Sequence, residues 1–499
     1  MVENVIKKIQ LSSLVLLLLL FWCGLAPSII AAQEKDESSD LLFVPADILD
    51  KPDDEQIPTG ILSEPSDSGN QERLPFNLVM ETSLWVFYER DTMSVPTPGS
   101  DFLRLQFIQA ADLHLKSKLF PRLGLSISDK LYYAFEHGRG INDHSLLNDL
   151  REIFVSWSVC SNAFVDIGRI NIKGGVAVGY NPTDYFKKDA VSEKLFEQDP
   201  AELRENRIGV VAIRGQYLAD NYSLSLAYAP ELSLSEEAFW QDENVFGLGL
   251  ASLNKSRRLL TKFGLNVFDK TKTEFLFYSE DDQSDIGVNI SRGIGNRIIA
   301  YLEWSGSHRL DVVSEAAKNF DAGGPNDEAD FVLPTDMKKG FYHQVSVGFS
   351  FSEDIDRTTY LEYHYNQAGL SSSDWDAWFN QGQLASEMLG NPDTIGPAMM
   401  RLGQLWSIRD GETEEPLSQH ELFLRTEWND SFMDNLDCYG ILKIDLVTSG
   451  YFFQPKLEYQ WSNAMWLTFT CNFNLGSTRS SYGSLPYFAS SKIEFNYYF

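Results

Sequence analysis

The chain alternates apolar and polar residues with a period of two from about residue 74 onward. In residues 491–499, one face carries Ile493, Phe495, Tyr497 and Phe499, and the other face carries Lys, Glu, Asn and Tyr. Strict alternation of this kind predicts a β-strand with one apolar face. The same pattern recurs in residues 222–228, 344–351, 361–366, 456–461 and 467–474.

The number of such segments indicates how the strands are assembled. Roughly eighteen or nineteen follow one another across residues 78–499, each about the nine to eleven residues that a tilted membrane-spanning strand requires. A β-sandwich could also place the polar face in water, but so many strands in one sheet need closure, because an open edge in lipid leaves backbone groups unpaired. Since bacterial barrels hold an even number of strands, the sequence predicts an all-β, antiparallel up-and-down transmembrane barrel of about 18 strands, with about 16 as the alternative.

The connections between the segments are alternately short and long. Short ones are expected at residues 218–221, 268–272 and 461–463, and long ones at residues 181–206, 305–339 and 366–419. Short periplasmic turns and long external loops are typical of outer-membrane barrels. Residues 375–389 favour a helix within the longest loop, which either lies over the mouth of the barrel or folds inward.

The first 73 residues do not share the period of two. Lys7 and Lys8 precede an apolar run at residues 14–23 and the small residues Ala31 and Ala32, which is the layout of a secretory signal peptide over residues 1–32. Residues 33–73 carry twelve carboxylates against three basic residues and are rich in Pro, Ser and Gly. This composition predicts a disordered periplasmic segment ahead of a barrel over residues 74–499.

Composition narrows the set of partners. The net charge of −30 argues against nucleic-acid binding, which needs a basic surface. Aromatic residues make up 13% of the chain, and a barrel needs aromatic girdles where it meets the two membrane interfaces. The last strand resembles the terminal strand of outer-membrane barrels, which implies that Phe499 is an assembly signal. The predicted location is therefore the bacterial outer membrane, with its lipid and the barrel-assembly machinery as partners.

One stretch stands apart from the strand pattern, residues 168–186, GRINIKGGVAVGYNPTDYF. Gly174 and Gly175 permit an unusual backbone, and Asn181 with Pro182 favours a turn that also includes Asp184. A strand reading GR, a Gly-rich link and then NPTD with an aromatic residue resembles large porin-like barrels, including the alginate-export family. The resemblance implies a passive conduit in which a basic lumen guides an extracellular polysaccharide or a similar anionic solute.

Basic residues near this motif are the candidates for the lumen or its constriction. They are Arg169, Lys173, Lys187, Lys188, Arg204, Arg207 and Arg214. Guanidinium groups pair bidentately with carboxylates and so suit an anionic sugar, although an ordinary lumen or rim charge is the favoured interpretation of each single candidate. The acidic chain as a whole opposes an anion pathway unless its carboxylates lie on the outer loops. Residues 187–207 mix both signs and would form a constriction if they fold inward rather than remain an exposed loop.

Two functions of different classes remain. The sequence contains no G-x-S-x-G, H-E-x-x-H, P-loop or G-x-G-x-x-G motif, which predicts no enzyme activity, no cofactor and no metal site. The first function is an outer-membrane channel for passive passage or export of a polysaccharide or small polar solute. The second is a non-conducting surface barrel whose long loops bind a partner. The channel is favoured because barrels of about 16–18 strands leave an aqueous interior.

Overall fold

A computed structural model describes most of the chain after residue 75. The described residues are 76–90, 95–96, 105–137, 142–187, 190, 199–232, 253–268, 270–281, 283–320, 331–353, 356–409 and 415–499. All of them fall within one compact unit, Pro45–Phe499. The predicted signal peptide at residues 1–32 and the acidic segment at residues 33–73 lie outside the described residues.

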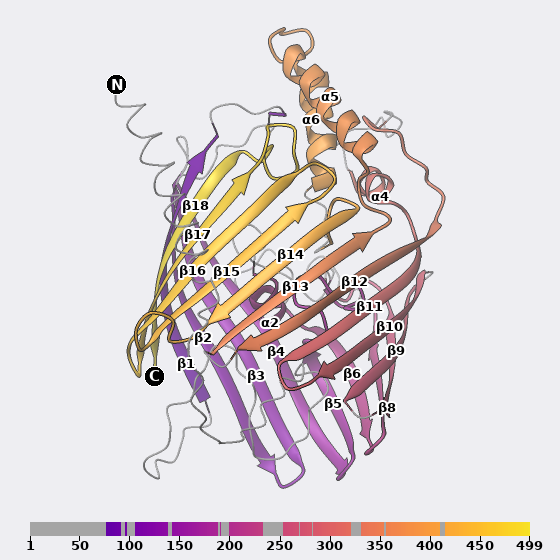
Figure 1. Cartoon of the computed structure of the whole chain (residues 1–499), viewed down its shortest axis with the longest axis vertical. Coiled ribbons are helices and arrows are strands. Elements are labelled where there is room, and N and C mark those ends of the chain that lie inside the picture. Colours follow the sequence, from indigo (N-terminus) through magenta and orange to yellow (C-terminus); the bar gives the residue numbers. More distant parts are fainter. Residues whose placement is uncertain are drawn as a thin grey trace. The chain divides into compact units, whose positions relative to one another are not determined.

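The described residues form a single antiparallel sheet of 18 strands (Figure 1). The strands are β1 (Phe76–Glu89), β2 (Leu105–Phe120), β3 (Leu123–His137), β4 (Asn142–Cys160), β5 (Ala163–Ile170), β6 (Val210–Leu218), β7 (Tyr222–Ala229), β8 (Arg258–Phe268), β9 (Thr271–Glu280), β10 (Gln283–Ile294), β11 (Ile298–Arg309), β12 (Gly340–Glu353), β13 (Arg357–Asn366), β14 (His420–Trp428), β15 (Leu436–Asp445), β16 (Gly450–Ser462), β17 (Met465–Leu475) and β18 (Tyr487–Tyr498). Each strand pairs with its neighbours along the chain, and β1 pairs with β18, with Val79 opposite Tyr498. The predicted closed barrel of about 18 strands is therefore confirmed.

The outer face of the barrel is apolar. On β7 the outward side chains Tyr222, Leu224, Leu226 and Tyr228 are 43–49% exposed, whereas the small residues at alternate positions face the interior. Large aromatic side chains are exposed near strand ends, as in Phe120, Trp157, Trp461 and Phe499. An apolar band with aromatic residues at its edge, on a closed sheet with a polar interior, is the architecture of outer-membrane barrels, and it places the chain in the bacterial outer membrane.

The two ends of the barrel differ in their connections. At the end that we call the turn end, hairpins such as residues 219–221 and 463–464 are short, as predicted. At the opposite end, the loop end, connections such as residues 171–209, 310–339 and 367–419 are long. β11 continues to Arg309, so the connection predicted to begin at Ser305 begins later. The last residues of β11 are small and polar because they face the lumen, so their sequence resembles that of a loop.

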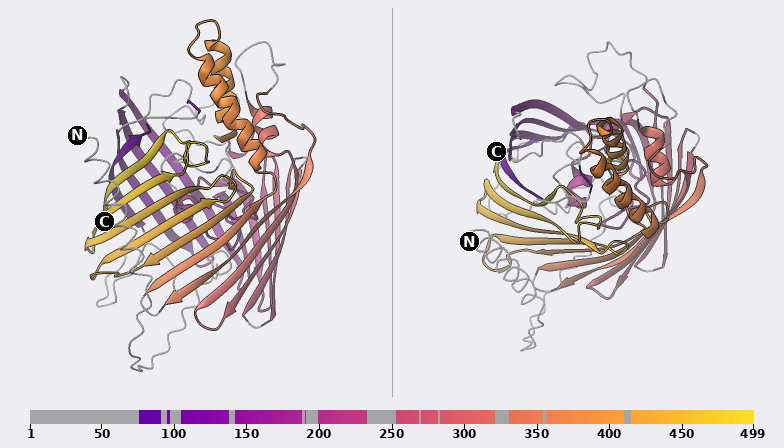
Figure 2. Two further views of the ribbon diagram at one scale, coloured as in Figure 1. Left: turned by 45° about the horizontal axis from the view of Figure 1, so that its top comes forward. Right: turned by 90° about the horizontal axis from the view of Figure 1, so that it is seen from above.

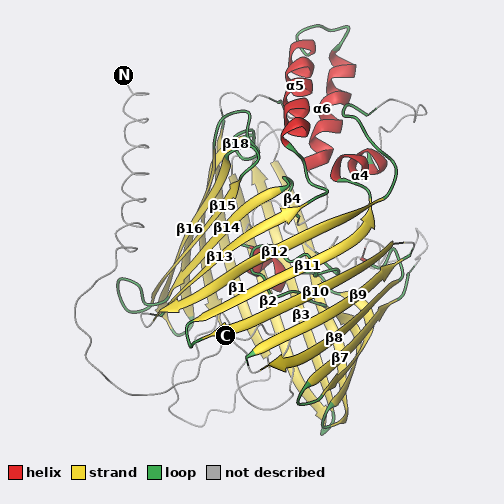
Figure 3. Cartoon of the chain, turned by 45° about the vertical axis from the view of Figure 1, so that its right-hand side comes forward, coloured by secondary structure: helices red, strands yellow, loops and turns green. Residues whose placement is uncertain are grey.

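Helices belong to the connections. Among the described residues they are α2 (Pro200–Glu205), α4 (Val312–Asn319), α5 (Ser372–Met388) and α6 (Ile395–Arg409). The helix predicted at residues 375–389 is α5, and its first turn is closed by a capping box between Ser371 and Asp374. In the view from above, α5 and α6 lie over part of the opening, and α2 lies inside the barrel (Figures 2 and 3). Among the described residues, no helix is both long enough and apolar enough to cross a membrane.

Arginine at an outward position should destabilise the barrel much more than arginine at the next, inward position. We expect Leu226→Arg to lower the free energy of unfolding by about 2–4 kcal/mol, because a guanidinium would enter the lipid band. Ser225→Arg, one residue away on the same strand, points into the barrel and should cost far less. Urea titration of barrels folded into lipid vesicles measures both, and equal losses would contradict the assignment of the two faces.

Candidate functional site

The described part of the connection between β5 and β6 (residues 171–187, 190 and 199–209), which we call the crossing segment, lies within the barrel. Its helix α2 is seen between the strands in Figures 1 and 3. Apolar residues of the segment, Ile172 and Phe186, are buried against Leu260, Leu276 and Tyr278 of the neighbouring wall. These apolar side chains therefore fix one flank of the crossing segment to β6–β9.

Two buried carboxylates of the wall accept the backbone of the crossing segment. The four successive N–H groups of residues 176–179 point at them: the first two donate to Glu303 on β11, and the last two donate to Glu362 on β13, at 2.7 and 2.9 Å. Both carboxylates are fully buried, at 0% and 1% exposure. Buried carboxylates and buried N–H groups are costly when they are left unpaired, so each satisfies the other.

The predicted turn motif lies beside this contact. The Asn181 amide donates to Glu303 at 3.2 Å, and the Asp184 N–H donates to the Asn181 carbonyl at 3.2 Å. Gly175 has φ +91°, and a Cβ on it would lie 2.7 Å from the Glu303 carboxylate. A Cβ on Gly179 would lie 2.5 Å from the Phe423 ring. The glycines are therefore needed where the backbone approaches the wall.

Glu362 is held in place by its own strand and by the neighbouring wall. The Tyr301 hydroxyl donates to it at 2.6 Å, and the His364 Nε2 atom lies 2.8 Å from its second oxygen. His364 is buried and stacks on the Phe423 ring. The wall itself therefore orients this carboxylate, in addition to the N–H groups of the crossing segment.

The later part of the crossing segment contacts the next strands of the wall, β14–β16. Asp199 caps α2 and also pairs with Arg425 on β14 at 3.0 Å. Glu202 in the first turn of α2 pairs with Lys456 on β16. Together with the apolar contacts on β6–β9, the contacts on β11–β13 and on β14–β16 hold the segment along a wide arc of the wall, as a constriction requires.

The structure places most of the predicted basic residues in local ion pairs or on backbone carbonyls. Arg207 pairs with Asp184 at 2.6 Å, and Arg214 pairs with Asp166 at 2.9 Å. The Lys173 Nζ atom lies 2.6 Å from Glu205. These cations and carboxylates lie side by side, so their fields largely cancel at a distance.

The remaining candidates bind main-chain oxygens. Arg169 donates to the Gly209 carbonyl at 2.9 Å, and Arg204 donates to the Gly174 carbonyl at 3.0 Å. Lys187 donates to the Asn181 carbonyl at 3.0 Å and lies over the Tyr180 ring. Lys188 lies outside the described residues. The selection of solute by these residues stays a prediction.

Sequence reasoning missed the wall residues that anchor the crossing segment. In the sequence, Glu362 and His364 belong to the polar face of the strand predicted at residues 361–366, and no motif marks Glu303, Arg425 or Lys456. The sequence signal for such an anchor is a charged side chain in the middle of an inward-facing row of a strand. A water-filled lumen would accept any polar residue at that position, so a charged residue there suggests a specific contact. That signal indicates a buried partner without naming it.

The long connection between β13 and β14 is tied to the rim by a bidentate ion pair. The two terminal nitrogens of Arg309 lie 2.8 Å from the two carboxylate oxygens of Glu415. Burial disfavours the charged carboxylate, but the Arg309 guanidinium outweighs burial and lowers the pKa of Glu415 to about 2. The pair is therefore charged at every pH at which the barrel is expected to work.

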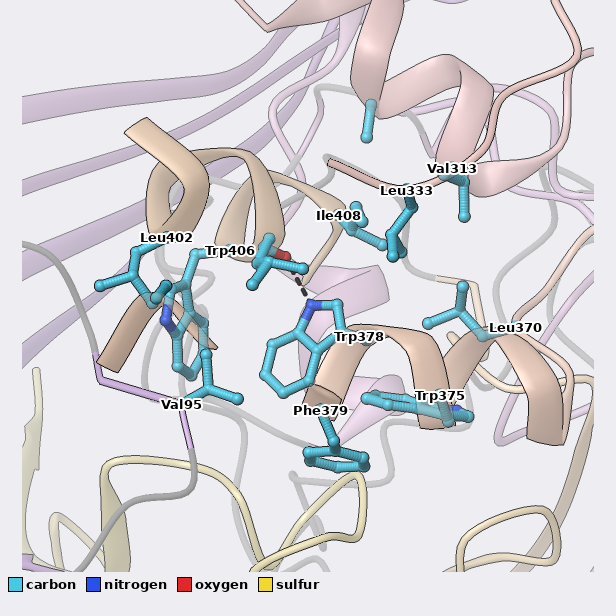
Figure 4. Close-up of a cluster of buried hydrophobic side chains, with 13 residues drawn as sticks. Val95, Val313, Leu333, Leu370, Trp375, Trp378, Phe379, Leu402, Trp406 and Ile408 are labelled. Carbon is cyan, nitrogen blue, oxygen red and sulfur yellow. Dashed lines mark hydrogen bonds between the residues drawn. The ribbon is translucent and has the colours of Figure 1, made fainter. Parts of the chain in front are cut away.

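A cluster of tryptophans holds α5 and α6 together above this rim. Trp375, Trp378 and Trp406 pack around the Arg409 guanidinium, which lies 5.5–5.6 Å from each ring centroid. Figure 4 shows the buried side chains and the hydrogen bond from the Trp378 indole to the Leu405 carbonyl, at 2.8 Å. Arg409 also donates to residues 481 and 484 in the connection before β18. The helical pair is thus fixed to the barrel rather than free.

The comparisons with known proteins give likenesses of fold. No protein-family model matches the chain, and no curated protein sequence matches it. Among solved structures, the chain is similar to OccAB1 of Acinetobacter baumannii, with 10% identity, 85% of this chain and 96% of that chain covered, and a TM-score of 0.46. It is also similar to OpdK of Pseudomonas aeruginosa, a structure solved with vanillate, with 10% identity, 85% and 98% covered, and a TM-score of 0.45. A third similar structure is OccK11 (OpdR) of Pseudomonas aeruginosa, with 8% identity, 85% of this chain and 95% of that chain covered, and a TM-score of 0.44. These comparisons do not show the resemblance to the alginate-export family.

Removing the charge of one anchoring carboxylate should loosen the crossing segment. In Glu303→Gln the side chain keeps its size, but it loses the charged acceptor of two N–H groups, which is worth about 1.5–3 kcal/mol. Hydrogen exchange of residues 176–179, followed by mass spectrometry, should accelerate roughly tenfold to hundredfold. The matched variant Glu353→Gln, at the turn end, should leave exchange in this segment unchanged. Equal protection in both variants would rule out Glu303 as an anchor.

The ion pair between Arg309 and Glu415 should make loop attachment depend on pH at the acid end. Because the pKa of Glu415 is lowered from its ordinary value of 4.5 to about 2, its contribution to stability is complete above pH 4.5 and is lost as the pH falls towards 2. At pH 7, Glu415→Gln should lower the free energy of unfolding by about 3 kcal/mol, since it leaves a buried guanidinium unpaired. Urea unfolding from pH 7 down to pH 2 should show the gap between wild type and variant closing. A gap that does not change with pH would contradict this assignment.

Proposed function

We propose that the chain forms a passive outer-membrane channel for small polar solutes. The observation that carries the proposal is the combination of a wide closed barrel with a crossing segment fixed to its inner wall through Glu303 and Glu362. An 18-stranded barrel is too wide for its wall side chains to fill, so its interior is aqueous unless a connection enters it. Here a connection enters and is anchored, which narrows a pathway in the way that selective channels require.

Small solutes fit this arrangement better than a polymer. A polysaccharide strand needs a continuous passage, whereas the crossing segment is attached to β6–β9, to β11–β13 and again at Arg425 on β14 and Lys456 on β16. Apart from the apolar contacts on β6–β9, those attachments are ion pairs and buried hydrogen bonds, which hold the segment against displacement. Within the channel proposal, passage of small polar solutes is therefore preferred, and export of a polysaccharide is the second choice.

The non-conducting alternative draws on the helical pair at the loop end. On α5 and α6, four apolar side chains outside the tryptophan cluster are 36–49% exposed, those of Leu384, Ile395, Met399 and Met400. Exposed apolar side chains at the loop end could contribute to a binding surface. A surface of this kind is compatible with a channel, so it does not replace the first proposal.

Conductance and solute flux test the channel directly. Purified barrel in a planar bilayer should give discrete, ohmic current steps in KCl. Vesicles that contain it should admit small polar solutes such as glycerol or glycine and exclude dextran. Replacing residues 174–186 by a short Gly-Ser linker should raise the conductance and admit larger sugars. A folded barrel that gives neither current nor flux would remove the proposal and leave the partner-binding alternative.

A further inference from the structure

A cavity on the loop-end side of the crossing segment carries a surplus of carboxylates. We call it the vestibule cavity; it is lined by the crossing segment, by β9–β12, by α4 and by Glu415. Five of its lining side chains are carboxylates, those of Asp184, Glu280, Asp285, Glu315 and Glu415. Three of these carboxylates have an arginine beside them, Asp184 with Arg207, Glu280 with Arg258 and Glu415 with Arg309. Asp285 is hydrogen-bonded instead by a neutral amide, so its charge disfavours an anion in the cavity and attracts a cation.

The two cations in the same lining are already engaged. Arg309 is bound bidentately by Glu415, at 2.8 Å for both contacts. Lys187 donates to the Asn181 carbonyl at 3.0 Å and lies 4.1 Å from the centroid of the Tyr180 ring. An anionic solute would have to displace these contacts and approach the carboxylates as well.

Two carboxylates offer oxygen atoms to a ligand. Asp184 is only 1% exposed, and its Oδ1 atom is buried with no hydrogen-bond partner, while its other oxygen pairs with Arg207. Asp285 is hydrogen-bonded by the neutral amide of Gln283, at 3.2 Å to each oxygen. A buried carboxylate oxygen without a donor is costly, so a ligand N–H group that reaches it gains more than it would at an exposed carboxylate.

Aromatic rings complete the lining. Tyr185 from the crossing segment stacks on Tyr278 from β9, with ring centroids 4.9 Å apart and planes 9° apart. Their hydroxyls are bound to Ser305 and Glu280, which holds both rings in place. Tyr278 is 2% exposed and packs against both Tyr185 and Phe186, so the half-buried Tyr185 is the ring that can contact an organic cation and its alkyl part.

We propose that the vestibule cavity binds small organic cations that carry N–H donors, that is, alkyl amines and guanidines, on their way through the barrel. This inference rests on the proposed channel function and names its solute class. Carboxylates recognise the ammonium or guanidinium group, and Tyr185, held in place by its stacking on Tyr278, contacts the carbon chain. The anionic solute implied by the alginate-export resemblance is the opposite expectation.

The first test measures current block by one probe and two controls. Agmatine, which carries an ammonium and a guanidinium, should interrupt the KCl current in a concentration-dependent way. Glutarate, an anion of similar length, and N-butylurea, a neutral analogue, should not do so. In a KCl gradient the reversal potential should show a preference for K⁺ over Cl⁻. Block by glutarate without block by agmatine, or a preference for Cl⁻, would overturn the proposal while leaving the channel in place.

The second test assigns the binding to this cavity. Asp285→Asn keeps the shape of the side chain and should weaken agmatine binding about tenfold, which corresponds to about 1.4 kcal/mol. Glu353→Gln makes the same change in net charge at the turn end and should leave agmatine binding as it is in the wild type. Equal weakening in both variants would mean a general charge effect and would overturn the assignment.

Calorimetry separates this proposal from the channel itself. Titration of agmatine into the folded barrel in detergent measures binding whether or not the barrel conducts. Binding without conductance would remove the channel and keep the cation site, with Asp285→Asn still expected to weaken it about tenfold. Conductance without any agmatine binding or block would keep the channel and remove the cation site.

Discussion

Every backbone N–H and C=O group of a strand that spans a bilayer has to be bonded to another strand, because lipid offers no partner. In this protein the requirement is met only when β1 and β18 meet, and closure through 18 strands sets a lumen wider than its own side chains can fill. Anything that narrows the lumen must therefore come from a connection. The crossing segment is such a connection, and its irregular backbone lies at a depth where unpaired groups would be costly unless the wall supplies partners.

The wall can supply those partners only through side chains, since its own backbone groups are used in the strand ladder. A carboxylate suits this role because its two oxygens can accept several N–H groups at once. Glu303 and Glu362 accept all four N–H groups of residues 176–179, and Tyr301 and His364 orient the second carboxylate. The charges in the lumen are thus structural first, because they hold the backbone that defines the pathway.

The barrel could be predicted from the sequence because the alternating pattern of a strand with one apolar face is visible within a few consecutive residues. The alternation in residues 222–228 and 491–499 depends only on neighbours two positions away, and the same holds for the capped helix α5. The anchoring of residues 176–179 does not, since Glu303 lies more than 120 positions further along the chain. No local pattern encodes that contact. Arg207 was recognised as a candidate by its type, but its effect depends on Asp184, whose position beside it comes from the turn at Asn181.

The same distinction explains why the basic candidates and the acidic composition implied opposite solutes. A cation acts on a distant solute only when its charge is not cancelled by a neighbour, and Arg207, Arg214 and Lys173 each have a carboxylate within 3 Å. The uncompensated charge at the loop end belongs to carboxylates whose hydrogen bonds come from neutral groups, as at Asp285. The charge preference of the pathway therefore depends on the charged side chains that do not hold the crossing segment in place. A count of basic residues near a motif cannot predict this preference.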